Sequence, residues 1–213
     1  MISKAEFKPF LKVNLPATLG SDLAGVVVEV GSQVTRFKPG DAVFASTFDS
    51  GVGSLAEFAV VAESAAAPKP TSLDFVQAAS IPMVGLTSWQ ALKERANLKA
   101  DQKVFIPAGS GGIGTFAIQL AKHLGAKVGT TTSTANIDLV RSIGADEVVD
   151  YKKQEFEDVL RDYDAVLGTV KGDALEKSLR ILKPGSTIVS LVGPPDVAFA
   201  RKRGMNFVMK TVF

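Results

Sequence analysis

The feature that most constrains the fold is a buried strand followed at once by a glycine-rich turn and an amphipathic helix, between Lys103 and His123. Residues 104–106 form a continuous apolar run, which is typical of a strand buried on both faces of a parallel sheet. Beyond the glycines, apolar side chains recur at helical spacing, at Ile113, Phe116, Ala117, Leu120 and Leu124. Glycines in this context let the backbone approach a pyrophosphate at the free N–H groups of a helix N-terminus. The segment therefore predicts a nucleotide site, with a purely structural tight turn as the alternative.

The chain beyond this segment alternates strands and helices with short connections, a pattern that predicts an α/β fold with a doubly wound parallel sheet. Asp173 is expected to cap one helix, with Glu176 in a near capping box, and residues 183–185 are expected to end that helix. A helix is also expected over residues 137–143. Further strands are expected at residues 127–131, 147–150, 164–167 and 187–192.

The first 70 or so residues have the pattern of a β-rich unit, with strands expected at residues 23–30, 42–45 and 55–61. Three strands cannot close a barrel, and open apolar edges favour aggregation, so we expect further strands from elsewhere or from before Met1. The run that ends at residue 213 has no terminator, and both ends of the chain look cut.

Two helices are expected to join the halves of the chain. Ser72 and Asp74 can cap the first helix, and the second covers residues 85–96. Leu86, Trp89 and Leu92 are expected on one stripe of that second helix. We expect two domains, one over residues 1–84 with the linker helix and one over residues 85–213.

Composition excludes several classes of site. The chain has no cysteine and one histidine, so disulfides are excluded and a zinc site is not expected. His123 falls in the last turn of the predicted helix, where a cation complements the helix dipole. The net charge of +2 gives no reason to expect nucleic acid, and the basic run at residues 201–203 is interpreted as a solvated turn. With no apolar span of membrane length and no signal peptide, a cytoplasmic location with no membrane partner is expected.

The end of the second parallel strand bears on the choice of cofactor. Sites that prefer NAD place a carboxylate there, roughly 20 residues beyond the glycines, to accept from the ribose 2′-OH. This chain has five hydroxyl residues at 130–134 and no acid before Asp138. Because an acid repels a 2′-phosphate and a hydroxyl can donate to it, the run favours NADP over NAD. Threonines that simply suit a strand end are the alternative interpretation.

Several motifs in order resemble the medium-chain dehydrogenase/reductase superfamily. The motifs are the glycine loop at residues 108–114, the segment at 85–89 and the segment at 144–151. Residues 19–25 and 38–41 resemble its GroES-like catalytic domain. The most similar branch is the zinc-independent NADPH:quinone oxidoreductases and enone or alkenal reductases. The resemblance implies a Rossmann sheet preceded by a partial GroES-like β-barrel.

The resemblance also implies residues that bind the cofactor. The pyrophosphate is expected at Ser110, Gly111, Gly112, Ile113 and Gly114. The 2′-phosphate and its ribose are expected at Ser133, Thr134 and Tyr151. The nicotinamide and its ribose are expected at Thr87, Val170, Val192 and Gly193.

Some positions depart from the family pattern. Ser21 and Met83 stand where zinc-dependent members have a histidine and a cysteine ligand, and Asn136 stands where some relatives have a lysine on the 2′-phosphate. The run at residues 168–172 differs from the usual turn after the fourth strand, which puts any contact there in doubt. Ser21 and Asp22 are expected on the substrate side, although Asp22 can equally be a buried carboxylate bonded to backbone. No general acid is assigned.

The activity implied by the resemblance is NADPH-dependent reduction of a small quinone or α,β-unsaturated carbonyl without zinc. A non-catalytic NADP-binding protein of the same fold, a sensor or a truncated form, is the alternative. Relatives often dimerise through their last Rossmann strand, so a homodimer is a further expectation, although that strand is not found within these 213 residues.

Overall fold

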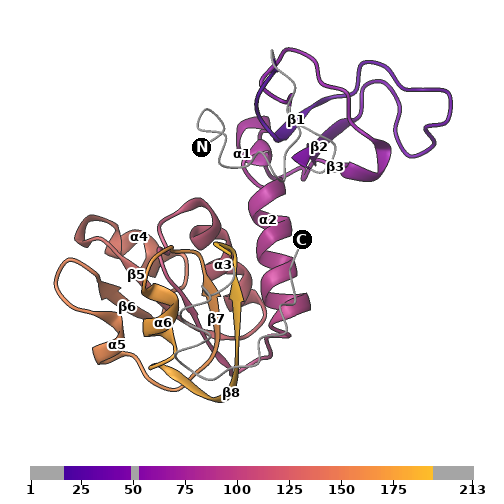
Figure 1. The fold of residues 1–213 in the computed structure, drawn as a ribbon. Helices are drawn as coiled ribbons and strands as arrows, with labels where there is room; N and C mark the ends of the chain where they lie inside the picture. The colour runs from indigo at the N-terminus through magenta and orange to yellow at the C-terminus, as the bar shows by residue number, and fades with distance from the viewer. Residues whose placement is uncertain (1–16, 49–52, 194–213) are drawn as a thin grey trace. The chain divides into compact units, whose positions relative to one another are not determined.

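The computed structural model describes residues 17–48 and 53–193, and the chain divides into two compact units, Met1–Leu86 and Thr87–Phe213. The boundary between the units falls inside helix α2, Pro82–Trp89 (Figure 1). The basic run at residues 201–203 and the run that ends at residue 213 lie outside the described residues. Every helix in the described ranges is too short or too polar to cross a bilayer.

The first unit contains an antiparallel sheet in the order β1-β2-β3. Its strands are β1, Asp22–Val26, β2, Ala42–Ser46, and β3, Ala66–Pro68, and a single 3-10 turn, Glu63–Ala65, precedes β3. Two predictions are corrected here. The first strand ends at Val26 rather than residue 30, and residues 55–61 form no strand. The edge of β2 pairs instead with β3, although alanine is a weak strand former, because pairing is decided by the neighbouring strand as well as by side-chain preference.

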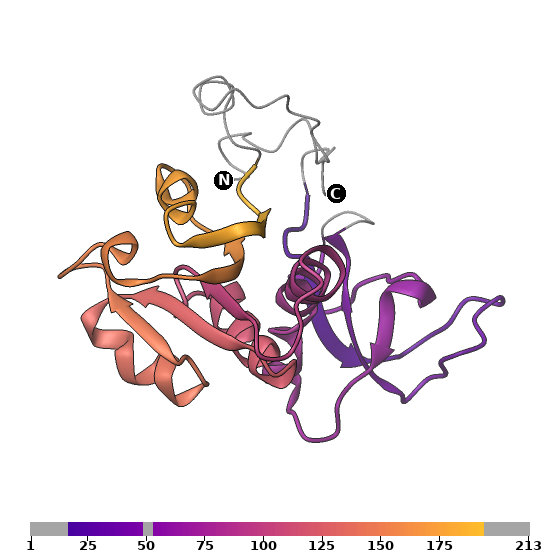
Figure 2. The same cartoon turned by 90° about the horizontal axis from the view of Figure 1, so that it is seen from below.

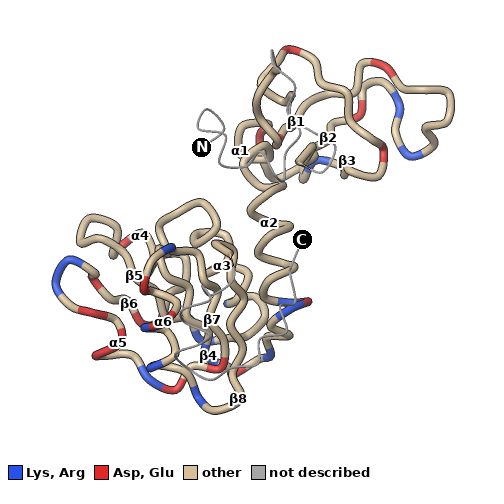
Figure 3. The backbone as a smooth tube through the Cα atoms, in the orientation of Figure 1, with Lys and Arg blue, Asp and Glu red and all other residues tan. Residues whose placement is uncertain are grey.

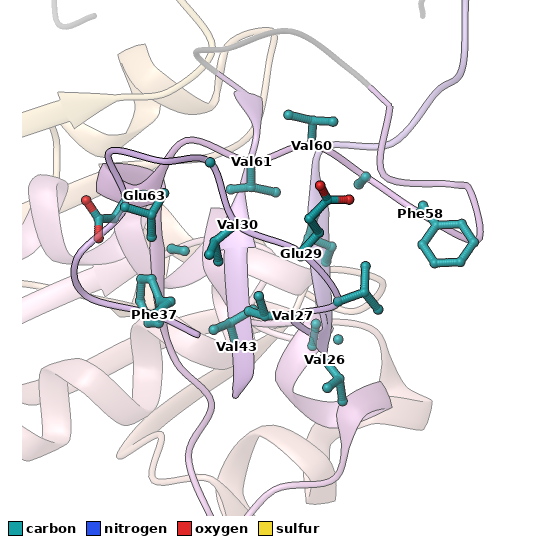
Figure 4. A pocket seen from close by; sticks show the side chains of 18 of the residues that line it. Val26, Val27, Glu29, Val30, Phe37, Val43, Phe58, Val60, Val61 and Glu63 are labelled. Carbon is teal, nitrogen blue, oxygen red and sulfur yellow. The ribbon is translucent and has the colours of Figure 1, made fainter. Parts of the chain in front are cut away.

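An apolar groove lies against this sheet (Figure 4). Figure 4 shows Val30, Phe37, Val43 and Val61 gathered around it. Glu63 stands at its rim and accepts a hydrogen bond from the Thr35 N–H at 2.9 Å. The three-stranded sheet thus leaves an apolar face open among the residues that the structure describes.

Two helices follow the sheet. Helix α1, Phe75–Ala79, begins with the predicted cap at Asp74. The Asp74 carboxylate accepts from the Gln77 N–H at 2.7 Å, and the Gln77 side-chain oxygen accepts from the Asp74 N–H at 3.1 Å. Helix α2 begins at Pro82 and continues into a π-helical turn, η4, Gln90–Arg95. The three residues predicted on one apolar stripe differ in burial. Leu92 is 1% exposed and in the core, but Trp89 and Leu86 are 45% and 56% exposed.

The second unit has a five-stranded parallel sheet in the order β6-β5-β4-β7-β8, and this confirms the predicted doubly wound α/β fold. The order reverses between β4 and β7, and ligands of such sheets bind beyond the carboxyl ends at this switch point. The strands are β4, Lys103–Ile106, β5, Lys127–Thr132, β6, Glu147–Asp150, β7, Tyr163–Gly168, and β8, Leu182–Ser190. The helices are α3, Gly112–His123, η5, Thr134–Asn136, α4, Ile137–Ser142, α5, Phe156–Val159, and α6, Ala174–Ser178.

The alternation of side chains along β4 explains why both faces of this sheet are covered. Val104 and Ile106 belong to one core cluster, which includes residues of η4, α3 and α4. Phe105 belongs to a second cluster, with Phe156 and Tyr163 packed on its ring. The side chains of Val104, Phe105 and Ile106 are all fully buried, as the continuous apolar run predicts. Figure 2 shows the helices on both faces of the sheet.

The last part of the sheet differs from the prediction. Asp173 precedes α6, but its side chain makes no capping bond and instead lies 3.4 Å from the Lys177 ammonium. Residues 183–185 do not end a helix. They lie inside β8, where the register with β7 shifts between Tyr163 and Ala165 and Gly185 takes a positive φ of 79°. Residues 183–185, which have the composition of a turn, therefore form an irregularity within a strand.

Candidate nucleotide-binding site

The loop after β4 is folded so tightly that two of its glycines have no room for a side chain. A Cβ on Gly114 would lie 2.5 Å from the Ala108 carbonyl oxygen and 2.7 Å from the Gly109 Cα. A Cβ on Gly109 would overlap the Thr130 hydroxyl. Ala108 itself has a φ of 55°, in the left-handed region. Helix α3 therefore begins directly against the end of β4. Gly111 and Gly114 were predicted to allow a close backbone approach, but Gly109 was missed, because its position beside β5 depends on the sheet.

The N-terminus of α3 is open. Gly111 is the N-cap residue, has no side chain to cap the helix, and is exposed with Gly112. The first N–H groups of an α-helix have no acceptor within the helix, and here they belong to Gly112, Ile113 and Gly114. With the helix dipole, such groups favour an anion. Helix α3 has twelve residues, and the exposed Gly111 and Gly112 leave space for an anion at its start.

The hydroxyl run at the end of β5 is mostly occupied within the fold. Thr130 donates to the Ile106 carbonyl at 2.6 Å, and the Thr131 hydroxyl accepts from the Ala108 N–H at 3.0 Å. Thr130, Thr131 and Thr132 are all buried. The inference that the whole run can donate to a 2′-phosphate is therefore corrected: these three threonines hold the loop after β4 against β5.

Ser110 is the centre of a small polar network at the same edge. Its hydroxyl oxygen accepts from the Thr132 hydroxyl at 2.9 Å and from the Asn136 amide at 3.2 Å. Asn136 also lies 3.4 Å from the Ser133 hydroxyl oxygen. Because Ser110 accepts twice, its own proton is free for an outside acceptor. The network brings Ser110 and Ser133, predicted for two parts of one cofactor, to one edge of the sheet.

Asp150 was not expected in this site. It is the last residue of β6, pairs in register with Thr132, and is 6% exposed. Its carboxylate accepts from the Thr134 hydroxyl at 2.6 Å and from the Lys152 N–H at 3.0 Å. The Thr134 bond and then the Lys152 N–H lower the pKa of Asp150 from its ordinary value, against the effect of burial. No short sequence spacing links Thr134 to Asp150, and only the parallel pairing of β5 with β6 brings them together.

Tyr151 follows Asp150 at the same edge and is 58% exposed. Its N–H donates to the Thr132 carbonyl at 3.2 Å, which continues the pairing of the two strands. The loop that follows carries Lys152 and Lys153, both exposed (blue beyond β6 in Figure 3). The Lys153 ammonium lies 3.8 Å from the Asp150 carboxylate. An exposed aromatic ring thus stands beside a loop of mixed charge.

The other predicted residues of this unit lie at the ends of β7 and β8. Gly168 pairs in register with Ser190, and the Leu191 N–H donates to the Gly168 carbonyl at 2.9 Å. Val170, Val192 and Gly193 follow these two strands. Thr169 donates to the Pro107 carbonyl at 2.7 Å and so ties the loops after β4 and β7 across the switch point. Sequence reasoning left this segment in doubt, because its turn differs from the family pattern.

Two other residues named in the sequence analysis, Thr87 and His123, lie in helices. Thr87 is in α2, one turn before the buried Ala91. His123 is exposed at the last residue of α3, the position expected for a cation at a helix C-terminus.

Ser21 and Asp22 belong to the first unit. The Asp22 carboxylate accepts from the Met83 N–H at 3.2 Å, at the start of α2, which agrees with the expected bond to backbone, and the residue is only partly buried. The Ser21 carbonyl accepts from the N–H and the hydroxyl of Thr47.

The side chains present do not fit a zinc ion. Ser21 and Met83 offer a hydroxyl and a thioether where zinc in proteins is held by thiolate, imidazole or carboxylate. In residues 17–48 and 53–193, no group of three or more carboxylate or imidazole side chains is placed to hold a metal.

Comparison with known proteins gives two family models in the expected order. The model described as "Alcohol dehydrogenase GroES-like domain" matches residues 2–71, and the model described as "Zinc-binding dehydrogenase" matches residues 112–210. Together they match both predicted parts of the fold. The second description names zinc, whose protein ligands are mainly cysteine and histidine, whereas this chain has no cysteine and a single histidine.

The individual relatives include reductases and oxidoreductases of enones, alkenals and quinones. The 2-methylene-furan-3-one reductase of Solanum lycopersicum is 39% identical over 196 residues, which cover 87% of this chain and 50% of that protein. The chloroplastic NADPH-dependent alkenal/one oxidoreductase of Arabidopsis thaliana gives the same identity and coverage. The solved quinone oxidoreductase of Coxiella burnetii is 37% identical with a TM-score of 0.79, covering 89% of this chain and 59% of that one. The chain spans about half the length of the curated relatives it matches.

Proposed function

We propose that this chain, a member of the medium-chain dehydrogenase/reductase superfamily, binds NADPH and reduces a quinone or an α,β-unsaturated carbonyl without zinc, as its quinone and enone reductase relatives suggest. The observation that supports the cofactor most directly is the open N-terminus of α3, packed against β4 through Gly109 and Gly114. The relatives described as NADPH-dependent, and as acting on alkenals or quinones, support the reaction.

In this proposal the chain's residues bind and orient. The N–H groups of Gly112, Ile113 and Gly114, with the free proton of Ser110, hold the pyrophosphate. Ser133, Thr134 and Tyr151 surround the 2′-phosphate and its ribose, beyond the ends of β5 and β6. Thr87, Val170, Val192 and Gly193 adjoin the nicotinamide and its ribose.

Bound NADPH supplies a hydride, and the reduced substrate gains a proton as well. Alignment and exclusion of water then matter more than an acid–base residue, which agrees with a single, exposed histidine. Thr169 and the residues that follow β7 and β8 hold the end of the sheet where that alignment is required. We assign no general acid, and zinc independence rests on the residue types at positions 21 and 83.

The test is to incubate the purified chain with NADPH and a panel of quinones and enones, following absorbance at the NADPH band. We expect oxidation that depends on both partners and is unaffected by a metal chelator. Tight NADPH binding with no substrate-dependent oxidation would favour the alternative, a non-catalytic NADP-binding protein of the same fold. Inhibition by the chelator, restored by zinc, would refute the metal-free mechanism.

A cytoplasmic location and a homodimer are kept as predictions. One relative is described as chloroplastic, so the compartment has to be measured by fractionation of the source cells. Sedimentation of the purified chain measures its oligomeric state.

A further inference from the structure

Asp150 places a negative charge at the edge where the proposed site receives the 2′-phosphate. The residue ends β6 in register with Thr132 of β5, and its carboxylate holds the Thr134 hydroxyl at 2.6 Å. Sites that prefer NAD have their carboxylate at the end of the second parallel strand, which is β5 here, whereas Asp150 ends the neighbouring strand β6. In the sequence, Asp150 is only the last residue of a predicted strand, and the glycine loop indicates no role for it.

Hydrogen-bond polarity determines what Thr134 can offer a ligand. A hydroxyl has one proton, and an ionised carboxylate can only accept. The Thr134 proton is therefore directed at Asp150, and its oxygen can only accept from a further partner. Ser110 is the opposite case, because it accepts from Thr132 and Asn136 and keeps its proton. Of the predicted phosphate ligands, Thr134 is thus withheld as a donor.

We propose that Asp150 limits the preference of this chain for NADPH over NADH, both by holding the Thr134 proton and by its own charge. The inference rests on the proposed function, since it takes the 2′-phosphate to lie beside Ser133 and Thr134. Lys153 offsets the charge only in part, because it is 66% exposed at 3.8 Å and solvent screens it. NADH has no 2′-phosphate, so the charge of Asp150 opposes its binding much less than it opposes the binding of NADPH.

The experiment compares Asp150→Asn with Asp158→Asn in the full chain. Asparagine keeps the shape of Asp150 and an acceptor for the Lys152 N–H. Asp158, exposed in α5, gives a matched loss of charge away from the polar network. Dissociation constants for NADPH and NADH are measured by calorimetry at low and high salt.

We expect Asp150→Asn to tighten NADPH binding by about three- to tenfold and to leave NADH within about twofold, with a smaller gain at high salt. Asp158→Asn should leave both constants within about twofold. The same ratio, measured with 2′,5′-ADP against 5′-AMP, tests this end of the site without the nicotinamide.

A double-mutant cycle with Thr134→Val tests the hydrogen-bond argument separately. In the wild-type chain the substitution should change NADPH binding by less than about twofold, because the Thr134 proton does not reach the phosphate. In the Asp150→Asn background it should weaken NADPH binding by about threefold or more, because the proton is then free to donate. Thermal melts confirm that each variant folds, and Asp150→Ser replaces Asp150→Asn if that variant is unfolded.

Two results would overturn the inference alone. If Asp150→Asn changes the dissociation constants for NADPH and NADH equally, Asp150 only supports the turn after β6. Weaker NADPH binding in that variant would also overturn it. A wild-type chain that binds neither NADPH nor NADH would overturn the proposed function as well.

Discussion

Gly114→Ala tests whether the close contact of α3 with β4 is what forms the phosphate cradle. The new Cβ would lie 2.5 Å from the Ala108 carbonyl oxygen, 2.7 Å from the Gly109 Cα and 2.8 Å from the Gly109 carbonyl oxygen. All three are backbone atoms, which cannot rotate away. Since real Cβ contacts essentially never fall below 3.0 Å, the helix start and the loop must separate by about 0.5 Å.

The energy of this separation follows from two opposing effects. Overpacking of a close contact costs about 1–3 kcal/mol, and alanine gains about 1 kcal/mol over glycine within a helix. The difference between the two effects is a fall of up to about 2 kcal/mol in the free energy of unfolding. The N–H groups that we propose hold the pyrophosphate move with the helix, so NADPH should bind at least about tenfold more weakly.

Urea unfolding and NADPH calorimetry measure the two quantities. Gly31→Ala is the control, because no atom lies within 4 Å of its Cβ and its φ is not in the left-handed region. Gly111→Ala is a second comparison inside the loop, where the only close atom is the Ala108 carbonyl oxygen at 3.2 Å and the φ of −79° suits alanine. Wild-type stability together with wild-type NADPH affinity in Gly114→Ala would refute the argument.

Three further substitutions test the fold itself. Gly129→Ala places a Cβ into the buried Tyr163 ring and should lower the free energy of unfolding by about 2 kcal/mol or more, whereas Gly168→Ala, with its nearest atom at 3.5 Å, should be much milder; equal urea midpoints would contradict this. Asp74→Ala removes the cap of α1 and should lower the free energy of unfolding by about 1 kcal/mol, while Asp74→Asn should retain most of it. Burial raises the pKa of Asp164, but hydrogen bonds from the Lys183 ammonium and the Lys103 N–H outweigh burial and lower it. Its stabilisation is therefore present above the ordinary Asp value of 3.8 and lost as pH falls through the lowered folded value, so Asp164→Asn should show a smaller loss of urea midpoint below pH 4 than wild type.

Local sequence patterns were sufficient for the strands β4 to β7 of the second unit but not for α6 and β8. The apolar run at residues 104–106 must be buried on both faces, and glycines directly before a helical period leave few other folds than strand, turn and helix. The strands at residues 127–131, 147–150 and 164–167 were found for the same reason, within a residue at each end. These signals are local because each strand carries its own burial pattern.

The first unit shows where local patterns fail. Residues 55–61 are rich in β-forming side chains but form no strand, and three residues beginning at Ala66 pair with β2 instead. Strand pairing is an interaction between distant segments, and no property of residues 55–61 alone shows which segment β2 will accept.

The sequence by itself determined the α/β class, the glycine loop and the absence of cysteine, because each depends on residue type or on spacing within one segment. Only the tertiary structure decided which hydroxyls are free. The parallel pairing of β5 with β4 and β6 buries Thr130 and directs Thr134 at Asp150. A hydroxyl has a single proton, and where it points is set by neighbours that are distant in the chain.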